Sequence, residues 1–276
     1  MRLVIQLAVV AAIAVVGSTL VNAVASNPPL TLIIGLVTAA AALLGYRWVV
    51  RRTEHRPIDE LSRTGAVPTL ALGTLIGVGL FASVILNIAF LDGYRVLGWG
   101  SPAGAVALVG FMAAAAVTEE LIFRGILFRI IEQWTGTWTA LVLTAALFGL
   151  SHLFNPHATL WGALAIAIEA GAMLAAAYAA TRTLWFPIGL HFGWNCAAGA
   201  IFSTEVSGND TPDGLLHAVM SGPTALTGGE FGPEGSVYAV LFASVLTVVF
   251  LWLAHRRGRI VSRREARTAP RTTLAP

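Results

Sequence analysis

The sequence predicts an all-α protein, a polytopic membrane helical bundle of about eight transmembrane helices with both termini in the cytoplasm. Of the 276 residues, 57% are hydrophobic and 11% are charged, whereas a soluble domain carries about 25% charged residues. The mean hydropathy is +0.78. Apolar runs of about 20 residues, the length that crosses a bilayer, recur along the whole chain.

Eight apolar segments approach this length, and polar or glycine- and proline-rich stretches separate them. They cover residues 3–24, 30–50, 67–91, 103–131, 137–154, 158–180, 184–204 and 236–254. The fourth is longer than one span requires and contains Gly110 and Gly125, so we expect it to tilt or break. Together the segments predict a single transmembrane domain over residues 1–255.

The arginines indicate the orientation of this domain. All seventeen cationic residues are arginine. With the N-terminus in the cytoplasm, every arginine except Arg95 lies in an inner loop, at an inner helix end or in the C-terminal tail. The longest outer connection, residues 205–235, carries acidic residues instead. This asymmetry satisfies the positive-inside rule and predicts a multi-pass protein of the cell membrane, inner or plasma.

The two ends of the chain are interpreted separately. Arg2, an apolar run and Ala23-Val24-Ala25 imitate a signal peptide with its cleavage site. The run is too long for a typical signal peptide, so we expect it to remain as a membrane helix. Residues 256–276 form a basic tail that we expect to be disordered and cytoplasmic, acting as a stop-transfer signal or contacting anionic lipid. These arginine positions explain the pI of 9.6, so the predicted partner is the lipid bilayer, with no nucleic acid.

Three ionisable residues lie within the fourth segment: Glu119, Glu120 and Arg124. Charge in the middle of a membrane is costly, so these residues indicate a functional site. Glu120 and Arg124 are four residues apart, which places them on one helix face where they can pair. Glu119 lies about 100° around the helix from Glu120. An unpaired, desolvated carboxylate of this kind is suited to accept a proton from water.

Two later segments carry histidines that can join this site. The fourth and fifth segments form a hairpin that turns near Trp134, which leaves Glu119 and His152 roughly 5 Å apart in depth. His191 and Asn195 are four residues apart and face one way, but His191 is roughly 10 Å shallower than Glu119 by the same count. Convergence therefore requires the seventh segment to start deeper in the bundle or to tilt. We expect one cavity, open to the cytoplasmic half.

The motifs occur in a recognisable order: Glu119-Glu120-Leu-Ile-Phe-Arg124, then Phe148-Gly-Leu-Ser-His152, then His191-Phe-Gly-Trp-Asn195. In this order they resemble the motifs of the CPBP intramembrane proteases. That family comprises the type II CAAX prenyl endopeptidases and the bacteriocin-processing and immunity proteins, including abortive-infection proteins. The resemblance covers residues 103–204 and includes Pro187, shortly before the third motif.

The resemblance implies an endopeptidase that uses glutamate-activated water on a membrane-associated or lipidated peptide or protein. It implies Glu119 as the base, Glu120 with Arg124 as its support, His152 and His191 as paired histidines, and Asn195 as an oxyanion donor. This mechanism requires no cofactor. If a metal takes part, zinc held by Glu119, His152 and His191 is the expected set, although the chain contains no His-Glu-x-x-His motif.

Two other classes of function remain open. A non-catalytic immunity or scaffold protein would keep these residues while binding a partner. A proton or ion transporter would use Glu119, His152 and Glu169 as a relay, but it predicts inverted repeats and broken helices, and neither is evident. For Glu169 itself, which lies mid-helix, a structural hydrogen bond is favoured over a place in the substrate cavity.

Reporter fusions test the predicted topology. Alkaline phosphatase, which is active only outside the cytoplasm, is expected to be active within residues 205–235 and inactive at the C-terminus, because the arginine asymmetry places these positions on opposite sides. A cytoplasmic reporter is expected to give the reverse pattern. An active phosphatase at the C-terminus would show that the predicted number of spans is wrong.

Overall fold

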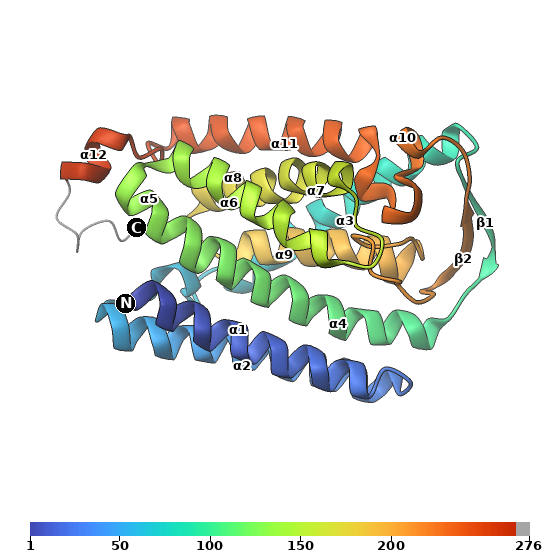
Figure 1. Ribbon diagram of the computed structural model, residues 1–276, viewed down its shortest axis with the longest axis horizontal. Coiled ribbons are helices and arrows are strands. Elements are labelled where there is room, and N and C mark those ends of the chain that lie inside the picture. Colours follow the sequence, from blue (N-terminus) through green and yellow to red (C-terminus); the bar gives the residue numbers. More distant parts are fainter. Residues whose placement is uncertain (269–276) are drawn as a thin grey trace.

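The computed structural model describes residues 1–268, which form a bundle of long helices with two short strands (Figure 1). The helices of the bundle are α1 (Arg2–Ala23), α2 (Pro28–Glu54), α3 (Ala66–Phe90), α4 (Pro102–Glu120) continued by η2 (Leu121–Phe128) and α5 (Arg129–Thr135), α6 (Thr137–Ser151), α7 (Leu160–Ile166) continued by η4 (Ala167–Ala172) and α8 (Met173–Thr181), α9 (Trp185–Asn195) continued by η5 (Cys196–Ile201), and α11 (Val237–Arg256). The smaller elements are η1 (Asp59–Leu61), β1 (Tyr94–Trp99), η3 (His152–Phe154), β2 (Leu216–Met220), α10 (Thr224–Thr227), η6 (Gly229–Phe231), η7 (Pro233–Gly235) and α12 (Arg263–Thr268). The all-α class is confirmed.

In the described part of the chain, seven helices are long and apolar enough to cross a membrane. The seventh predicted segment, residues 184–204, is not among these seven: it forms the helix α9–η5, which is shorter and is buried along almost all of its length. It connects the end of the bundle where α8 finishes to the end where α11 begins (Figure 1). The N-terminus and α12 therefore lie at one end, which we call the terminal end. The opposite end, with β1, β2 and residues 202–236, we call the loop end.

The fourth segment differs from expectation, and the outer connections contain strands. Residues 102–135 form one continuous helix that does not break, although η2 within it is π-helical. In place of the expected break, the helix changes its backbone hydrogen-bond pattern over this π-helical stretch. At the loop end, β1 and β2 pair as antiparallel strands, and β2 lies within the longest outer connection, residues 205–235.

The described part of the C-terminal tail contacts the bundle, and the disorder expected for residues 256–276 stays a prediction. Arg257 and Arg259 both donate hydrogen bonds to the carbonyl oxygen of Ala180 at the end of α8, and α12 follows. These arginines satisfy a carbonyl that the helix leaves without a partner. Residues 269–276 lie outside the described residues.

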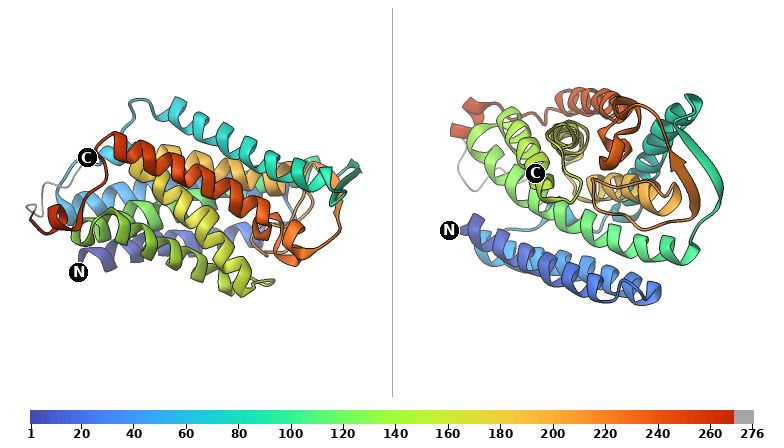
Figure 2. Two further views of the ribbon diagram at one scale, coloured as in Figure 1. Left: turned by 90° about the horizontal axis from the view of Figure 1, so that it is seen from above. Right: turned by 45° about the vertical axis from the view of Figure 1, so that its right-hand side comes forward.

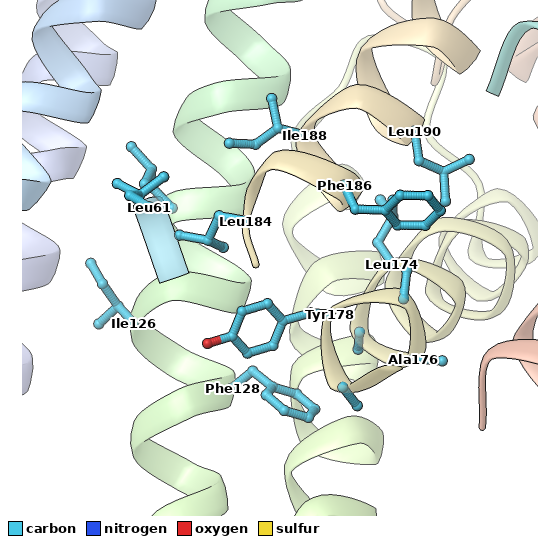
Figure 3. Packing of buried hydrophobic residues seen from close by; sticks show 14 of the residues in the cluster. Leu61, Ile126, Phe128, Leu174, Ala176, Tyr178, Leu184, Phe186, Ile188 and Leu190 are labelled. Carbon is cyan, nitrogen blue, oxygen red and sulfur yellow. The ribbon is translucent and has the colours of Figure 1, made fainter. Parts of the chain in front are cut away.

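The helix α7–η4–α8 lies at the centre of the bundle, where Figure 2 shows it nearly end on among its neighbours. Every residue of α8 from Met173 to Ala180 is buried, and five of these eight are alanine. Small side chains allow the surrounding helices to approach closely. Tyr178 then fills the space beside Phe128, with ring centroids 5.6 Å apart (Figure 3).

Glycines bring α3 and α9 into direct backbone contact. A Cβ atom at Gly73 or Gly77 on α3, or at Gly189 or Gly193 on α9, would lie 2.2–2.4 Å from a backbone oxygen of the other helix. Small residues four apart on facing membrane helices are a recurring packing motif. Because His191 lies between the two glycines of α9, this contact sets the position of the third motif.

Replacing Gly77 tests this packing. Gly77→Ala is expected to lower the free energy of unfolding by about 1–3 kcal/mol, since its Cβ would lie 2.2 Å from the Leu190 oxygen. Gly79 on the same helix has no atom within 4 Å of its Cβ position, so Gly79→Ala is the matched control and is expected to be neutral or stabilising. Thermal unfolding in detergent measures both variants. Equal stability of the two would contradict the close approach.

Candidate active site

A buried ion pair organises the candidate site. Arg124 Nη1 lies 2.6 Å from Glu120 Oε1, and the two side chains are 1% and 0% exposed. Arg124 Nη2 donates to the carbonyl oxygens of Ala170 and Gly171, each 2.9 Å away. The pair expected from the four-residue spacing is therefore present, and it also ties η2 to the π-turn η4.

Glu120 also orients His191. Its Oε1 lies 3.0 Å from His191 Nδ1. Because a carboxylate oxygen accepts the hydrogen bond, Nδ1 carries the proton and Nε2 is left to face other groups. Glu119 Oε2 lies 3.9 Å from His191 Nε2, so the imidazole ring is held between the two glutamates.

The depth of His191 shows how the seventh segment meets the site. The segment between α2 and α3 folds under the start of α9, where the amide of Leu184 donates to the Glu60 carbonyl oxygen at 2.8 Å. The helix α9 therefore begins inside the bundle. This deeper start removes the mismatch of roughly 10 Å that counting residues from the preceding turn predicts.

The two glutamates differ in their surroundings. The Glu120 side chain is fully buried, whereas the Glu119 side chain is 32% exposed. Among the described residues, Oε2 of each glutamate has no hydrogen-bond partner, but Oε1 of Glu120 meets both Arg124 and His191. This contrast agrees with the expected difference between a paired carboxylate and a free one.

His152 is held in a similar way to His191. Its Nδ1 lies 2.7 Å from the carbonyl oxygen of Phe148, which can only accept, so Nδ1 is again the donor and Nε2 is left free. The Phe148 ring lies 4.8 Å from the His152 ring and 6.0 Å from the His191 ring, between centroids. Arg124 lies over the same ring, with its guanidinium carbon 4.8 Å from the centroid. The Phe148 ring therefore lies close to three ionisable side chains, those of Arg124, His152 and His191.

Four of the predicted residues line a single cavity of about 780 Å³: Glu119, His152, His191 and Asn195. Glu120 and Arg124 do not line it and support His191 from within the protein. Asn195 follows His191 by one helical turn and is 8% exposed. The structure therefore brings all six predicted residues together, four at the cavity surface and two beneath it.

The exposed part of the cavity lining lies toward the loop end, whereas the sequence predicts an opening to the cytoplasmic half. Its exposed lining residues are Ser18, Asn22, Ala25, Ser151, Asn209, Asp210 and Pro212, and these lie near that end of the bundle. With the termini in the cytoplasm, as the arginines predict, the cavity faces the opposite side of the membrane. Counting residues along the helices predicts depth but does not tell which end is open.

Charged side chains close the terminal end instead. Arg129 Nη1 and Arg56 Nε each lie 2.7 Å from Glu54 Oε2, and Arg56 Nη2 lies 2.6 Å from Glu60 Oε1. The Tyr46 hydroxyl lies 2.6 Å from the same Glu60 oxygen. Burial alone would lower the pKa of Arg56, but its hydrogen bonds with Glu60 and Glu54 outweigh that effect and raise the pKa. This cluster of paired and largely buried charges lies at the start of α9, where the Leu184 amide donates to the Glu60 carbonyl oxygen.

Two further acids, Glu169 and Glu234, line the cavity. The sequence favours a structural hydrogen bond for Glu169, which the described residues do not provide, and it does not single out Glu234. Glu169 in η4 is 1% exposed, and both of its carboxylate oxygens lack a hydrogen-bond partner among the described residues. Glu234 accepts hydrogen bonds from Trp194 Nε1 at 2.9 Å and from the amide and hydroxyl of Ser207 at 2.5 and 2.8 Å. Burial raises the pKa of the Glu234 carboxyl, and these hydrogen bonds offset part of the rise. The sequence offers a signal for Glu169, because an acidic residue in the middle of an apolar helix is unusual. It offers none for Glu234, because that residue is one of several acids in a loop.

A metal ion would need several ligating side chains grouped around one point. Across residues 1–268, no three His, Cys, Asp or Glu side chains are grouped so that they could hold a metal. Glu119, His152 and His191 share the cavity but do not form such a group as they stand. We therefore derive no step through a metal, and the zinc set remains a prediction from the resemblance.

Comparison with known proteins places the central part of the chain. Residues 101–197 match the family model described as type II CAAX prenyl endopeptidase Rce1-like. This central region is therefore similar to the Rce1-like family. The matched region contains all three motifs and all six predicted residues, and it confirms the resemblance stated for residues 103–204. No curated protein and no solved structure matches the chain. At the level of the family, this match supports an intramembrane protease, and the seven long apolar helices of the described residues support a multi-pass membrane protein.

Variants of the ion pair test its contribution to stability. Glu120→Gln is expected to lower the free energy of unfolding by about 3–5 kcal/mol, because it leaves the buried Arg124 charge without its counter-charge. The double variant Glu120→Gln, Arg124→Gln is expected to recover part of this loss, since no lone charge remains. Thermal unfolding in detergent measures both, with Glu230→Gln as control because that side chain is 90% exposed. A Glu120→Gln protein as stable as the wild type would contradict the pairing.

Proposed function

We propose that the protein is an intramembrane endopeptidase that hydrolyses a peptide bond in a membrane-associated or lipidated peptide or protein by glutamate-activated water. The observation that supports it most is the presence of Glu119, His152, His191 and Asn195 in one cavity within a bundle of membrane-spanning helices. The Rce1-like family match agrees with this class of reaction.

Glu119 is the proposed base. It is half-buried, unpaired on one oxygen and at the cavity surface, so it can take a proton from water while the water oxygen attacks the carbonyl carbon of the peptide bond. The carbonyl oxygen then becomes an oxyanion. Glu120 is already engaged by Arg124 and His191, which makes it unsuited to this role and suited to supporting the site.

Asn195 and His191 are the proposed donors to the oxyanion. The Asn195 amide carries N–H groups, and the His191 ring offers Nε2–H when it is protonated at both nitrogens, while Glu120 holds Nδ1. An oxyanion donor of this type contributes about 3–4 kcal/mol to the transition state. His152, with Nδ1 fixed on a backbone carbonyl, orients the water, or its free Nε2 passes the proton that Glu119 took from water to the leaving nitrogen as the carbon–nitrogen bond breaks.

The direction of the cavity changes the proposed route of the substrate. The cavity opens at the loop end, and its lining combines apolar side chains of α1, α4 and α8 with the polar groups of the site. The substrate peptide, with apolar residues next to the bond that is cleaved, therefore enters from the loop end or from the adjoining bilayer. With the predicted topology, that route starts outside the cytoplasm.

The test is the cleavage of a membrane-associated model peptide by the full chain reconstituted in liposomes, with the products identified by mass spectrometry. Glu119→Gln is expected to reduce cleavage at least about a hundredfold, because the amide cannot accept the proton. Its thermal unfolding is expected to stay close to that of the wild type, since volume and most contacts are kept. Glu230→Gln is the control and is expected to keep full activity.

Two results would count against the proposal. Full activity of Glu119→Gln would remove Glu119 as the base. Failure of the wild type to cleave any membrane peptide, with folding intact, would favour the non-catalytic immunity or scaffold function.

A further inference from the structure

The cavity holds a second acidic position, separate from the proposed catalytic group. Glu169 lies in the π-turn η4 and is almost completely buried, yet neither of its oxygens has a hydrogen-bond partner in residues 1–268. The nearby Arg124 does not compensate it, because that guanidinium binds Glu120 and the carbonyl oxygens of Ala170 and Gly171. A buried carboxyl group without a partner is costly unless something else meets it.

Glu234 forms the other side of this position. Three donors from Trp194 and Ser207 hold its carboxylate. The loop that carries it is fixed on α7, since Trp161 Nε1 donates to the Gly235 carbonyl oxygen at 2.7 Å. Glu169 and Glu234 line the same cavity, so their two carboxyl groups face one shared space. Glu234 is thus rigidly placed, whereas Glu169 is left open.

The charge of the whole cavity points the same way. Of the described residues that line it, four carry carboxyl groups, Glu119, Glu169, Asp210 and Glu234, and none carries a guanidinium. A guest that brings positive charge would offset these carboxyl groups and supply the donors that Glu169 lacks. A metal ion is a poor candidate, because the described residues offer no group of three ligating side chains.

We propose that Glu169 and Glu234 form a substrate subsite that accepts a basic side chain, arginine or lysine, of the peptide to be cleaved. The proposal rests on the proposed function in that the guest is a peptide, but binding can be measured without cleavage. Both residues act here as specificity residues, and the peptide bond is left to Glu119 and its neighbours.

Binding of matched peptides tests the subsite. The full chain with Glu119→Gln, in detergent, is titrated into fluorescent apolar peptides that carry one arginine, or citrulline at the same position, with the position moved along the series. Citrulline keeps the shape of arginine and removes its charge. At the best position, the arginine peptide is expected to bind at least roughly tenfold more tightly.

Substitutions then assign this preference. Glu169→Gln, added to the same background, is expected to bring the arginine and citrulline affinities to within about twofold of each other. Glu234→Gln is expected to weaken the preference as well and serves as the second variant if Glu169→Gln fails to fold. Glu230→Gln, an acid at the loop end with a 90% exposed side chain, is the matched control and is expected to keep the full preference.

The outcomes separate the two proposals. Equal affinity for arginine and citrulline peptides at every position, or an unchanged preference in folded Glu169→Gln or Glu234→Gln protein, would overturn the subsite. An arginine preference that depends on Glu169, together with absence of cleavage by the wild type, would support the subsite while removing the endopeptidase function.

Discussion

The need to satisfy one buried guanidinium inside a membrane bundle connects the parts of this structure. Arg124 is 1% exposed and divides its hydrogen bonds between Glu120 on its own helix and two carbonyl oxygens of η4. Glu120 in turn positions His191 on α9. A single charge thus links three helices, and an uncompensated charge at this depth would be strongly destabilising. Its placement requires the helices to meet in one register.

A second polar layer, at the terminal end, determines which way the site faces. The cluster of Glu54, Arg56, Glu60 and Arg129 fills the space beneath α9, and α9 consequently starts inside the bundle. The loop end has no comparable plug in the described residues that line the cavity, which include exposed positions such as Asn22 and Asn209. The same arginines that satisfy the positive-inside rule therefore also close one end of the molecule.

Particular residues show how far the sequence could predict this structure. Spacing of four residues correctly predicts the Glu120–Arg124 pair, and hydropathy predicts the bundle helices to within a few residues at most ends. The depth of His191 and the direction of the cavity could not be predicted, because both depend on how residues 55–65 and 202–236 pack against the helices. Glu234 was missed for the same reason: only the folded loop brings it to Trp194.

Three π-helical turns place polar groups at the cavity or directly beneath it. They are η2, η4 and η5, and they contain or adjoin Arg124, Glu169 and Asn195. A π-turn widens the helix and interrupts the regular ladder of backbone hydrogen bonds. At η4, the oxygens of Ala170 and Gly171 accept from Arg124, so the irregular turn helps the guanidinium to be buried, and the guanidinium helps the turn to persist. The turn also carries Glu169 to the cavity, which couples the unpartnered acid of the proposed subsite to the ion pair that supports His191.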